Sequence, residues 1–244
     1  MANVVAYHRP SSVDSALQLL TRSGVSSRVL GGGTGLIGGG GHGDPFEAVD
    51  LQDTGLGGIS VGDSRATLGA TVTLEQLSRH ADLPYAVRDA ARRELPSTLR
   101  TLATLGGTIC AGESESEFLA TLLVHDPVVE IHGVDGRREL PMPQVWAEPH
   151  HLAGRVITAI SIATDGVTRS DRTARTPADR PIVAAVARRA DDGRVRLALS
   201  GVAPRPTLVG DPSGVRPVGD FRGTAAYRRD LAITLAARVI GALR

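Results

Sequence analysis

The stretch Ser27-Arg-Val-Leu-Gly-Gly-Gly-Thr-Gly-Leu-Ile-Gly-Gly-Gly-Gly-His-Gly43 joins a short apolar segment to thirteen residues of which nine are glycine. Residues 27–30 have the composition of a strand, and the glycine run that follows them predicts a loop. Glycine permits positive φ and lets the backbone approach a ligand closely, so successive N–H groups of such a loop can surround a phosphate. This loop is the first candidate for a ligand site.

The same loop also matches the glycine pattern of Rossmann dinucleotide-binding sites. Gly33, Gly35 and Gly38 fit G-x-G-x-x-G, and Asp53 lies about twenty residues after Gly33, where a ribose ligand is expected. In that motif the third glycine opens a helix, but here it is followed by more glycine and by Pro45. Each glycine costs a helix about 1 kcal/mol and proline about 3 kcal/mol relative to alanine. The sequence therefore disfavours a Rossmann site.

A second glycine segment, Thr104-Leu-Gly-Gly-Thr108, lies farther along the chain. A flexible surface turn would explain either segment alone. Both follow an apolar, strand-like stretch, and both place threonine beside a glycine pair. We interpret them as two loops that hold a pyrophosphate from opposite sides.

Periodicity predicts a mixed α and β chain. The expected strands are residues 4–7, 27–30, 47–51, 59–61, 65–70, 128–132, 156–162, 182–189 and 194–200. One expected helix begins after Ser12, and further helices are expected over residues 74–79, 85–93, 116–124 and 225–243. Residues 167–179 are polar and predict a linker or an exposed loop. We therefore expect a boundary there, with one domain over residues 1–166 and a smaller strand-plus-helix domain over residues 167–244.

Composition excludes several functions. A net charge of +1, from 27 basic and 26 acidic residues, offers no positive surface for nucleic acid. The sequence has no apolar run long enough to span a bilayer and no signal-peptide pattern at its start, so we expect a cytoplasmic protein. Cys110 is the one cysteine, so an iron–sulfur cluster would have to be held by a partner. Lysine is absent, which excludes Schiff-base, pyridoxal and Walker-type chemistry.

Several phrases, in order and over nearly the whole chain, resemble the FAD-binding subunits of molybdenum hydroxylases, such as carbon monoxide dehydrogenase medium chains and xanthine dehydrogenase flavin subunits. They are RPSSVDSALQLL, RVLGGGTGL, LRTLATLGGTICAGESESEFLATLL, RTPADRPIVAAV, LALSGVAPRP and RGTAAYRRDLA. The resemblance implies an α+β fold with a two-part FAD-binding domain of the vanillyl-alcohol-oxidase type. It also implies a small C-terminal domain like that of the carbon monoxide dehydrogenase flavoprotein.

The resemblance also implies an FAD site. The expected cofactor-binding residues come from three segments: Leu30, Gly31, Gly32, Gly33, Thr34, Gly35 and Leu36; Thr104, Leu105, Gly106, Gly107 and Thr108; and Ser116 with Glu117. Glu117 stands where the family usually has an aspartate that bonds FAD hydroxyl groups. No catalytic residue and no metal ligand are expected in this chain.

The function implied is electron transfer through FAD in a hetero-oligomer. A large molybdopterin subunit would oxidise the substrate, and a small iron–sulfur subunit would pass the electrons on. An alternative is a flavin-free assembly or docking module, because Gly35, Thr108 and Glu117 differ from the residues usual in the family. A self-contained flavin oxidase or reductase is disfavoured, because no histidine, tyrosine or lysine set near either loop could take a substrate proton.

Other polar groups have simpler explanations. His150 and His151 are adjacent in sequence, so their side chains should diverge, and we expect surface histidines without a shared metal. Glu113 and Glu115 are expected as solvated acids near a helix N-terminus, where the helix dipole favours negative charge. No Ser-His-Asp order or G-x-S-x-G elbow supports a hydrolase.

Overall fold

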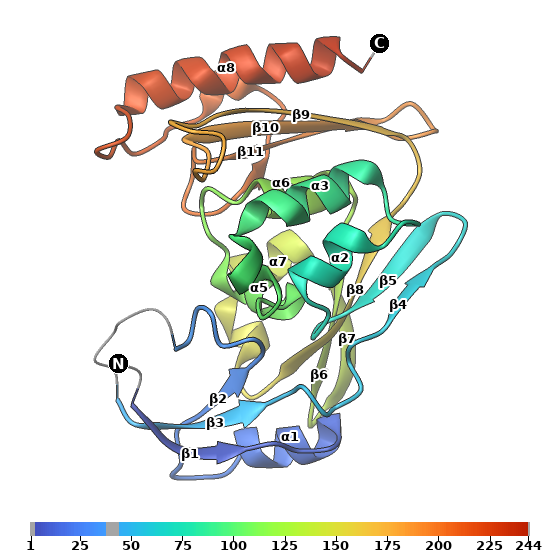
Figure 1. Cartoon of the computed structure of the whole chain (residues 1–244), viewed down its shortest axis with the longest axis vertical. Coiled ribbons are helices and arrows are strands. Elements are labelled where there is room, and N and C mark those ends of the chain that lie inside the picture. The colour runs from blue at the N-terminus through green and yellow to red at the C-terminus, as the bar shows by residue number, and fades with distance from the viewer. Residues whose placement is uncertain (1–2, 38–43, 244) are drawn as a thin grey trace.

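The computed structural model describes residues 3–37 and 44–243 and confirms an α+β fold built on three sheets (Figure 1). Residues 38–43, with the third glycine of the dinucleotide pattern, lie outside the described residues. The chain runs from a small parallel sheet, through a larger antiparallel sheet with its covering helices, to a C-terminal sheet under a long helix.

The first sheet is parallel, with strand order β1-β3-β2. Its strands are β1 Val4–His8, β3 Phe46–Asp50 and β2 Ser27–Leu30. Helix α1, Val13–Leu20, joins β1 to β2 and begins with a capping box between Ser12 and Ser15. Its buried Ala16 and Leu17 pack in one apolar cluster with Val49, which fixes the helix on the sheet.

The second sheet is antiparallel, with order β4-β5-β8-β6-β7. Its strands are β4 Ile59–Val61, β5 Arg65–Gly69, β8 Val156–Ala163, β6 Val128–Gly133 and β7 Gly136–Pro141. In β6, the core residues Val129 and Ile131 alternate with less buried ones, as expected of a sheet with one face covered. The edge strand β7 is polar and exposed, which limits pairing with another chain.

A layer of short helices covers the inner face of this sheet (Figure 1). It contains α2 Leu74–Arg79, α3 Tyr85–Glu94, α4 Ser97–Arg100, α5 Leu105–Ala111, α6 Glu117–Val124, α7 Met142–Ala147 and the 3-10 turn η1 Pro149–Leu152. All residues of α6 are buried, because this helix lies between α3 and the C-terminal sheet. An amphipathic helix pattern is therefore absent from α6.

The C-terminal sheet is antiparallel, with order β12-β11-β10-β9. It consists of β12 Thr207–Leu208, β11 Val195–Ser200, β10 Val183–Arg189 and β9 Val167–Thr173, followed by the turn η2 Pro212–Gly214 and helix α8 Ala225–Gly241. Strand β10 is buried on both faces. Val183 and Ala185 pack with α8, whereas Val186 belongs to the main core with α6. One apolar core thus continues into the C-terminal sheet.

Two of the expected local structures are wrong. Residues 167–173 form the strand β9 and not a linker, and they are polar because β9 lies at the edge of its sheet. Thr104–Thr108 begins the helix α5, because the Thr104 side chain caps it and accepts from the Gly107 amide at 3.2 Å. The division into residues 1–166 and 167–244 stays a prediction.

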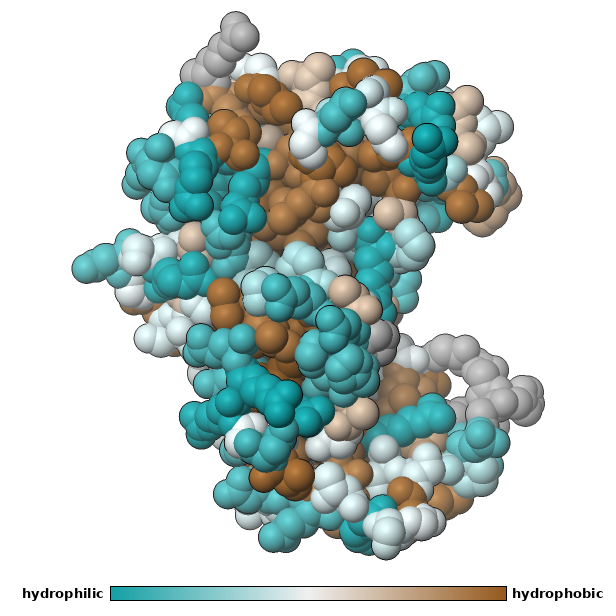
Figure 2. Space-filling model, turned by 180° about the vertical axis from the view of Figure 1, so that it is seen from behind, coloured by the Kyte–Doolittle hydropathy of each residue, from teal (hydrophilic) through white to brown (hydrophobic). Residues whose placement is uncertain are grey.

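The rear of the molecule carries an apolar hollow in its upper half, where Figure 1 places the C-terminal sheet (Figure 2). One cavity of about 640 Å³ is lined by Leu123, Trp146, Pro204 and Leu208, among others. No helix within the described parts of the chain has the length and apolar character needed to cross a membrane.

We predict that His125 makes stability depend on pH. Its buried ring donates from Nδ1 to the Ala163 carbonyl at 2.7 Å, and Nε2 lies 3.1 Å from the Thr168 hydroxyl. Burial lowers the pKa of His125 from 6.5 to about 4. Because the unfolded chain binds the proton more tightly, the free energy of unfolding should fall by about 3 kcal/mol as the pH drops from 6.5 to 4.

Urea unfolding of the wild type and of His125→Asn at several pH values tests this. The variant should lose most of this pH dependence, whereas His150→Gln, which removes an exposed ring, should keep it. If the free energy of unfolding of His125→Asn depended equally steeply on pH, groups other than His125 would be responsible.

Candidate cofactor site

The first glycine loop lies against residues 102–104, at the start of the second glycine segment. A Cβ atom at Gly32 would lie 1.6 Å from the carbonyl oxygen of Leu102, and one at Gly31 would lie 2.5 Å from Oγ1 of Thr104. No side chain fits in either space. These two glycines are therefore required by contact within the protein, and they bring the first loop against the start of α5.

The second segment uses its amides for anchoring. Leu105 N–H donates to the Val72 carbonyl at 2.8 Å, and Gly106 N–H donates to the Ala70 carbonyl at 2.9 Å. The Gly107 amide donates to the Thr104 side chain. The first turn of α5 thus offers a ligand a surface without side chains rather than free N–H groups.

In the first loop, several backbone amides have no hydrogen-bond acceptor among the described residues. Within residues 3–37 and 44–243, the amides of Gly32, Gly33, Thr34 and Gly35 donate no hydrogen bond to the protein. Gly33 has a φ of +74°, and a Cβ at Gly35 would meet no atom within 4 Å. Successive free amides with one residue in the left-handed region form an anion-binding nest. The loop is therefore built to receive an anionic group.

Two adjoining grooves lie along this contact, and both are lined by Val29, Gly31, Thr104, Gly107 and Cys110. The small groove, about 400 Å³, extends between β2 and the segment before β8. The large groove, about 670 Å³, extends past Gly32–Leu36 towards α3 and α4. Together they form an elongated site with the glycine contact at its middle, which suits a ligand with a central anionic group.

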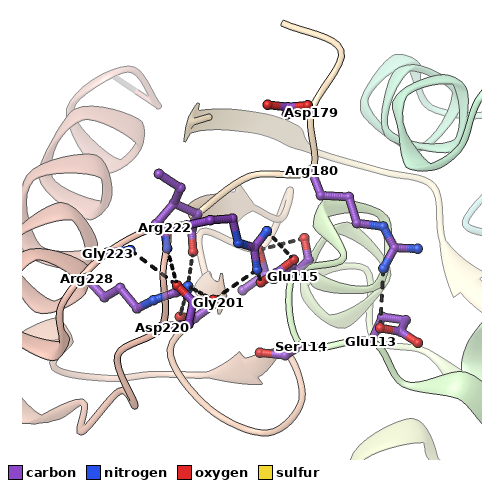
Figure 3. A network of polar contacts seen from close by, with 12 residues as sticks. Glu113, Ser114, Glu115, Asp179, Arg180, Gly201, Asp220, Arg222, Gly223 and Arg228 are labelled. Carbon is purple, nitrogen blue, oxygen red and sulfur yellow. Dashed lines mark hydrogen bonds and ion pairs between the residues drawn. The ribbon is translucent and has the colours of Figure 1, made fainter. Parts of the chain in front are cut away.

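The segment before β10 contributes a positively charged side chain to the large groove. Arg180 precedes β10, lines this groove and lies 3.3 Å from a carboxylate oxygen of Glu113 (Figure 3). Among the described residues that line the large groove, Arg180 carries the positive charge. Arg28 and Arg155 line the small groove. Glu94 and Glu113 also line the large groove, so the excess of positive side chains lies in the small groove, where it favours an anionic group.

Two groove residues have shifted pKa values. Burial raises the pKa of the Glu94 carboxyl, against the opposing effects of Arg180 and of hydrogen bonds from Ser116 and the Phe118 amide. Burial also raises the pKa of the Cys110 thiol to about 11. Neither group supplies a strong nucleophile at neutral pH, and no histidine or tyrosine is among the described residues that line either groove.

A polar network joins the loop after α5 to the C-terminal segment (Figure 3). Gly201 N–H donates to the Ser114 carbonyl at 2.7 Å, and Arg222 donates to Glu115 at 2.7 Å. Asp220 pairs with both Arg222 and Arg228, at 3.2 and 2.7 Å. Glu115, 17% exposed and paired with Arg222, is not the solvated acid that was expected, whereas Glu113 is 53% exposed beside Arg180.

Glu117 and Ser116 are placed differently from the glycine loops. Glu117 is only 3% exposed, and its carboxylate lies 2.9 Å from Arg93 and 3.4 Å from Arg172. Ser116 caps α6 by accepting from the Leu119 amide at 2.9 Å. Neither is among the residues that line the two grooves. Their proposed contact with a ligand stays a prediction.

Most of the expected site residues come together. Those lining the grooves are Gly31, Gly32, Gly33, Thr34, Gly35, Leu36, Thr104, Gly106, Gly107 and Thr108. Leu30 and Leu105 are buried in the core beside them. Groove residues that the sequence did not reveal are Glu94, Leu95, Leu99 and Arg180. Arg180 lies far from both glycine segments in sequence, and Glu94, Leu95 and Leu99, which precede the second segment, carry no local motif. Asp53, the ribose ligand of the Rossmann alternative, pairs instead with Arg9 at 2.8 Å.

Comparison with known proteins identifies a matching family and similar chains. The family described as FAD binding domain in molybdopterin dehydrogenase matches residues 3–164. "Uncharacterized protein YgfM" of Escherichia coli K12 is 28% identical over 91% of this chain and 90% of its own length. The "Carbon monoxide dehydrogenase medium chain" of Afipia carboxidovorans is 30% identical, over 64% of this chain and 57% of its own.

Solved structures share the fold. A carbon monoxide dehydrogenase chain from Hydrogenophaga pseudoflava aligns with a TM-score of 0.88 and 20% identity, over 100% of this chain and 98% of that one. A chain of quinoline 2-oxidoreductase from Pseudomonas putida 86 aligns with a TM-score of 0.86 and 22% identity, over 98% and 96%. At these identities the likeness concerns the fold alone.

The burial of Glu117 generates a stability prediction. Glu117→Ala leaves Arg93 and Arg172 without their shared carboxylate and should lower the free energy of unfolding by about 2 to 4 kcal/mol. Glu113→Ala removes an exposed pair with Arg180 and should cost less than about 1 kcal/mol. Chemical denaturation of the unliganded proteins measures both. Equal losses in the two variants would show that the pairing of Glu117 contributes little.

Proposed function

We propose, from the premise that this chain belongs to the family of FAD-binding domains in molybdopterin dehydrogenases, that it holds FAD and relays electrons within a larger enzyme. The oxidoreductase would use FAD bound here to pass electrons from iron–sulfur clusters on a partner to a final acceptor. The observation that carries the proposal is the row of amides at Gly32–Gly35, which have no acceptor among the described residues and belong to a loop that lines the large groove together with Gly107.

The residues present fit FAD. Its pyrophosphate is a central dianion, and the free amides of the first loop supply the donors that such a group requires. Gly107 is exposed and lines both grooves, so its missing side chain leaves room for the cofactor to pass from one groove to the other. Arg28, which lines the small groove, would add to the attraction of the anion, whereas the charge of Arg180 is offset by Glu113 at 3.3 Å.

When bound, FAD supplies the capacity to accept and release electrons, and the chain positions it. The first loop would fix the pyrophosphate, and Leu95 and Leu99 would exclude water from one wall of the large groove. The guanidinium of Arg180 would contribute a positive charge to the large groove. Glu94 and Glu113 are the carboxyl groups among the described residues of the large groove. The hydrogen bonds of Glu94 with Ser116 and Phe118 turn it towards the start of α6, and Glu113 pairs with Arg180.

Partners follow from the same proposal. The names of two relatives, a carbon monoxide dehydrogenase medium chain and a xanthine dehydrogenase FAD-binding subunit, are names of subunits. A lone cysteine cannot hold an iron–sulfur cluster. We therefore propose a large molybdopterin subunit and a small iron–sulfur subunit as partners. The apolar hollow at the rear supports a subunit contact, because exposed apolar surface of this kind marks interfaces (Figure 2).

A second candidate function is a flavin-free assembly or docking module. The observation that favours it is Glu117, whose carboxylate is shared by two arginines rather than free for a ribose or ribityl hydroxyl. A self-contained flavin oxidase finds less support, since the described groove residues include no histidine, tyrosine or lysine for proton transfer.

Glycine substitutions test the FAD site. Gly107→Val should place a branched side chain at the junction of the grooves and weaken FAD binding at least about tenfold. Its Cβ would also lie 3.0 Å from Oγ1 of Thr104, so overpacking should cost about 1 to 3 kcal/mol of folding stability. Gly106→Val is the matched variant. A Cβ at Gly106 would lie 3.1 Å from the Ala70 carbonyl oxygen, so overpacking should cost about 1 to 3 kcal/mol of folding stability.

Titration of FAD fluorescence, with thermal unfolding of the apoproteins, separates the two effects. The wild type should take up one FAD and show the absorption bands of oxidised flavin. A wild type that binds no FAD would favour the docking module. Unchanged affinity in Gly107→Val would place the cofactor elsewhere.

Expression with and without neighbours tests the partners. In its host, the chain should co-purify with a large molybdopterin protein and a small cysteine-rich one. Expressed alone, it should oxidise no substrate of the complex. Turnover of such a substrate by the isolated chain would overturn the subunit proposal.

A further inference from the structure

The turn Glu148–Leu152 brings two histidines and a glutamate together, outside the grooves and away from any role proposed above. The Nε2 atom of His151 lies 3.2 Å from Oε2 of Glu148, and Nε2 of His150 lies 3.4 Å from the same oxygen. The three donor atoms all lie within 4.8 Å of one another. The expectation that adjacent histidines diverge is wrong here, because the ring centroids are 4.5 Å apart.

The local backbone explains the convergence. Residues 149–152 form a 3-10 turn, in which side chains at i and i+3 eclipse each other, so Glu148 and His151 lie on one side. His151 N–H donates to the Glu148 carbonyl at 2.9 Å, and Ala153 N–H donates to the His150 carbonyl at 3.1 Å. The ring of His150 then lies beside that of His151. The turn fixes all three positions within five residues.

The distances suit a metal ion better than direct hydrogen bonds. A charge-assisted N–H···O bond measures about 2.7–2.9 Å, and both nitrogen–oxygen distances here are longer. In a tetrahedral zinc site with ligand bonds of about 2.0–2.1 Å, neighbouring ligand atoms lie about 3.4 Å apart. The two observed separations therefore match the edges of such a tetrahedron.

The surroundings permit a cation. Arg155 is the nearby positive charge, reaching the His150 carbonyl at 3.5 Å, but its guanidinium is neutralised by Asp135 at 2.9 Å. His151 is the anchored member, with 18% of its side chain exposed, whereas the side chains of Glu148 and His150 are 56% and 70% exposed. Solvent therefore reaches the side chains of Glu148 and His150, and a metal ion can approach from that side.

We propose that Glu148, His150 and His151 bind one divalent transition-metal ion of the zinc type, with water at the fourth position. Two imidazoles and one carboxylate form a donor set that zinc accepts, and magnesium or calcium would require oxygen ligands instead. The turn runs directly into residues 152–157, which line the small groove. A bound ion would hold this wall of the groove in place.

The test uses the tag-free full chain after dialysis against a chelator. Calorimetric titration with Zn²⁺ should show one saturable site, and Co²⁺ should give the visible absorption of a four-coordinate complex. Glu148→Gln and His151→Gln should each weaken Zn²⁺ binding at least about tenfold. His150→Gln, with its exposed ring, should do the same without disturbing the fold, as thermal unfolding of the metal-free variants will show.

His8→Gln is the matched control. His8 lies 2.6 Å from Glu47, so it is a second histidine–glutamate pair, but the described residues there include no third ligand. Its loss should leave Zn²⁺ affinity unchanged. The proposal is overturned if the wild type shows no saturable binding, if His150→Gln binds like the wild type, or if His8→Gln abolishes binding.

Discussion

The architecture of the site depends on one contact, where the backbone of the first glycine loop lies on the backbone of residues 102–104. At Gly32 a single carbon atom would collide with the Leu102 carbonyl. This contact joins the parallel sheet, through β2, to the helical layer on the antiparallel sheet. Both grooves lie along it, so the close approach of the two segments shapes the site, and the first loop supplies amides that have no acceptor among the described residues.

The two glycine segments are similar in composition, but their backbone amides have different roles. The amides of Leu105 and Gly106 anchor α5 to the end of β5, since their acceptors are the carbonyls of Val72 and Ala70 just beyond that strand. Of the two segments, the first loop is the one with a run of successive amides that have no acceptor among the described residues. A composition rich in glycine shows where chains approach closely, and the hydrogen-bond partners decide whether the neighbour is a ligand or another part of the protein.

Local signals predicted much of the fold. Strand Ser27–Leu30 and helix Leu74–Arg79 have the predicted bounds, because apolar pattern and the capping residue Thr73 agree there with the tertiary structure. Where tertiary contacts override local preference, prediction failed. The amides that anchor α5 turn a glycine segment into a helix, and pairing with β10 makes a strand of polar residues 167–173. Glu94 and Arg180 were missed because only the folded chain brings them to the groove.

The absence of lysine has a structural consequence in this chain. A guanidinium has five donors in a fixed plane, so it can bond backbone carbonyls and a carboxylate at once. Arg228 donates to the carbonyls of Ile182 and Gly201 at 2.7 and 2.9 Å and pairs with Asp220. Arg100 similarly binds Glu75 and the Arg92 carbonyl, which places the corner between α3 and α4 beside the large groove. A lysine ammonium lacks this planar geometry, so a lysine at these positions would join the same groups less specifically. The contacts of these arginines include the polar network between the C-terminal segment and the loop after α5.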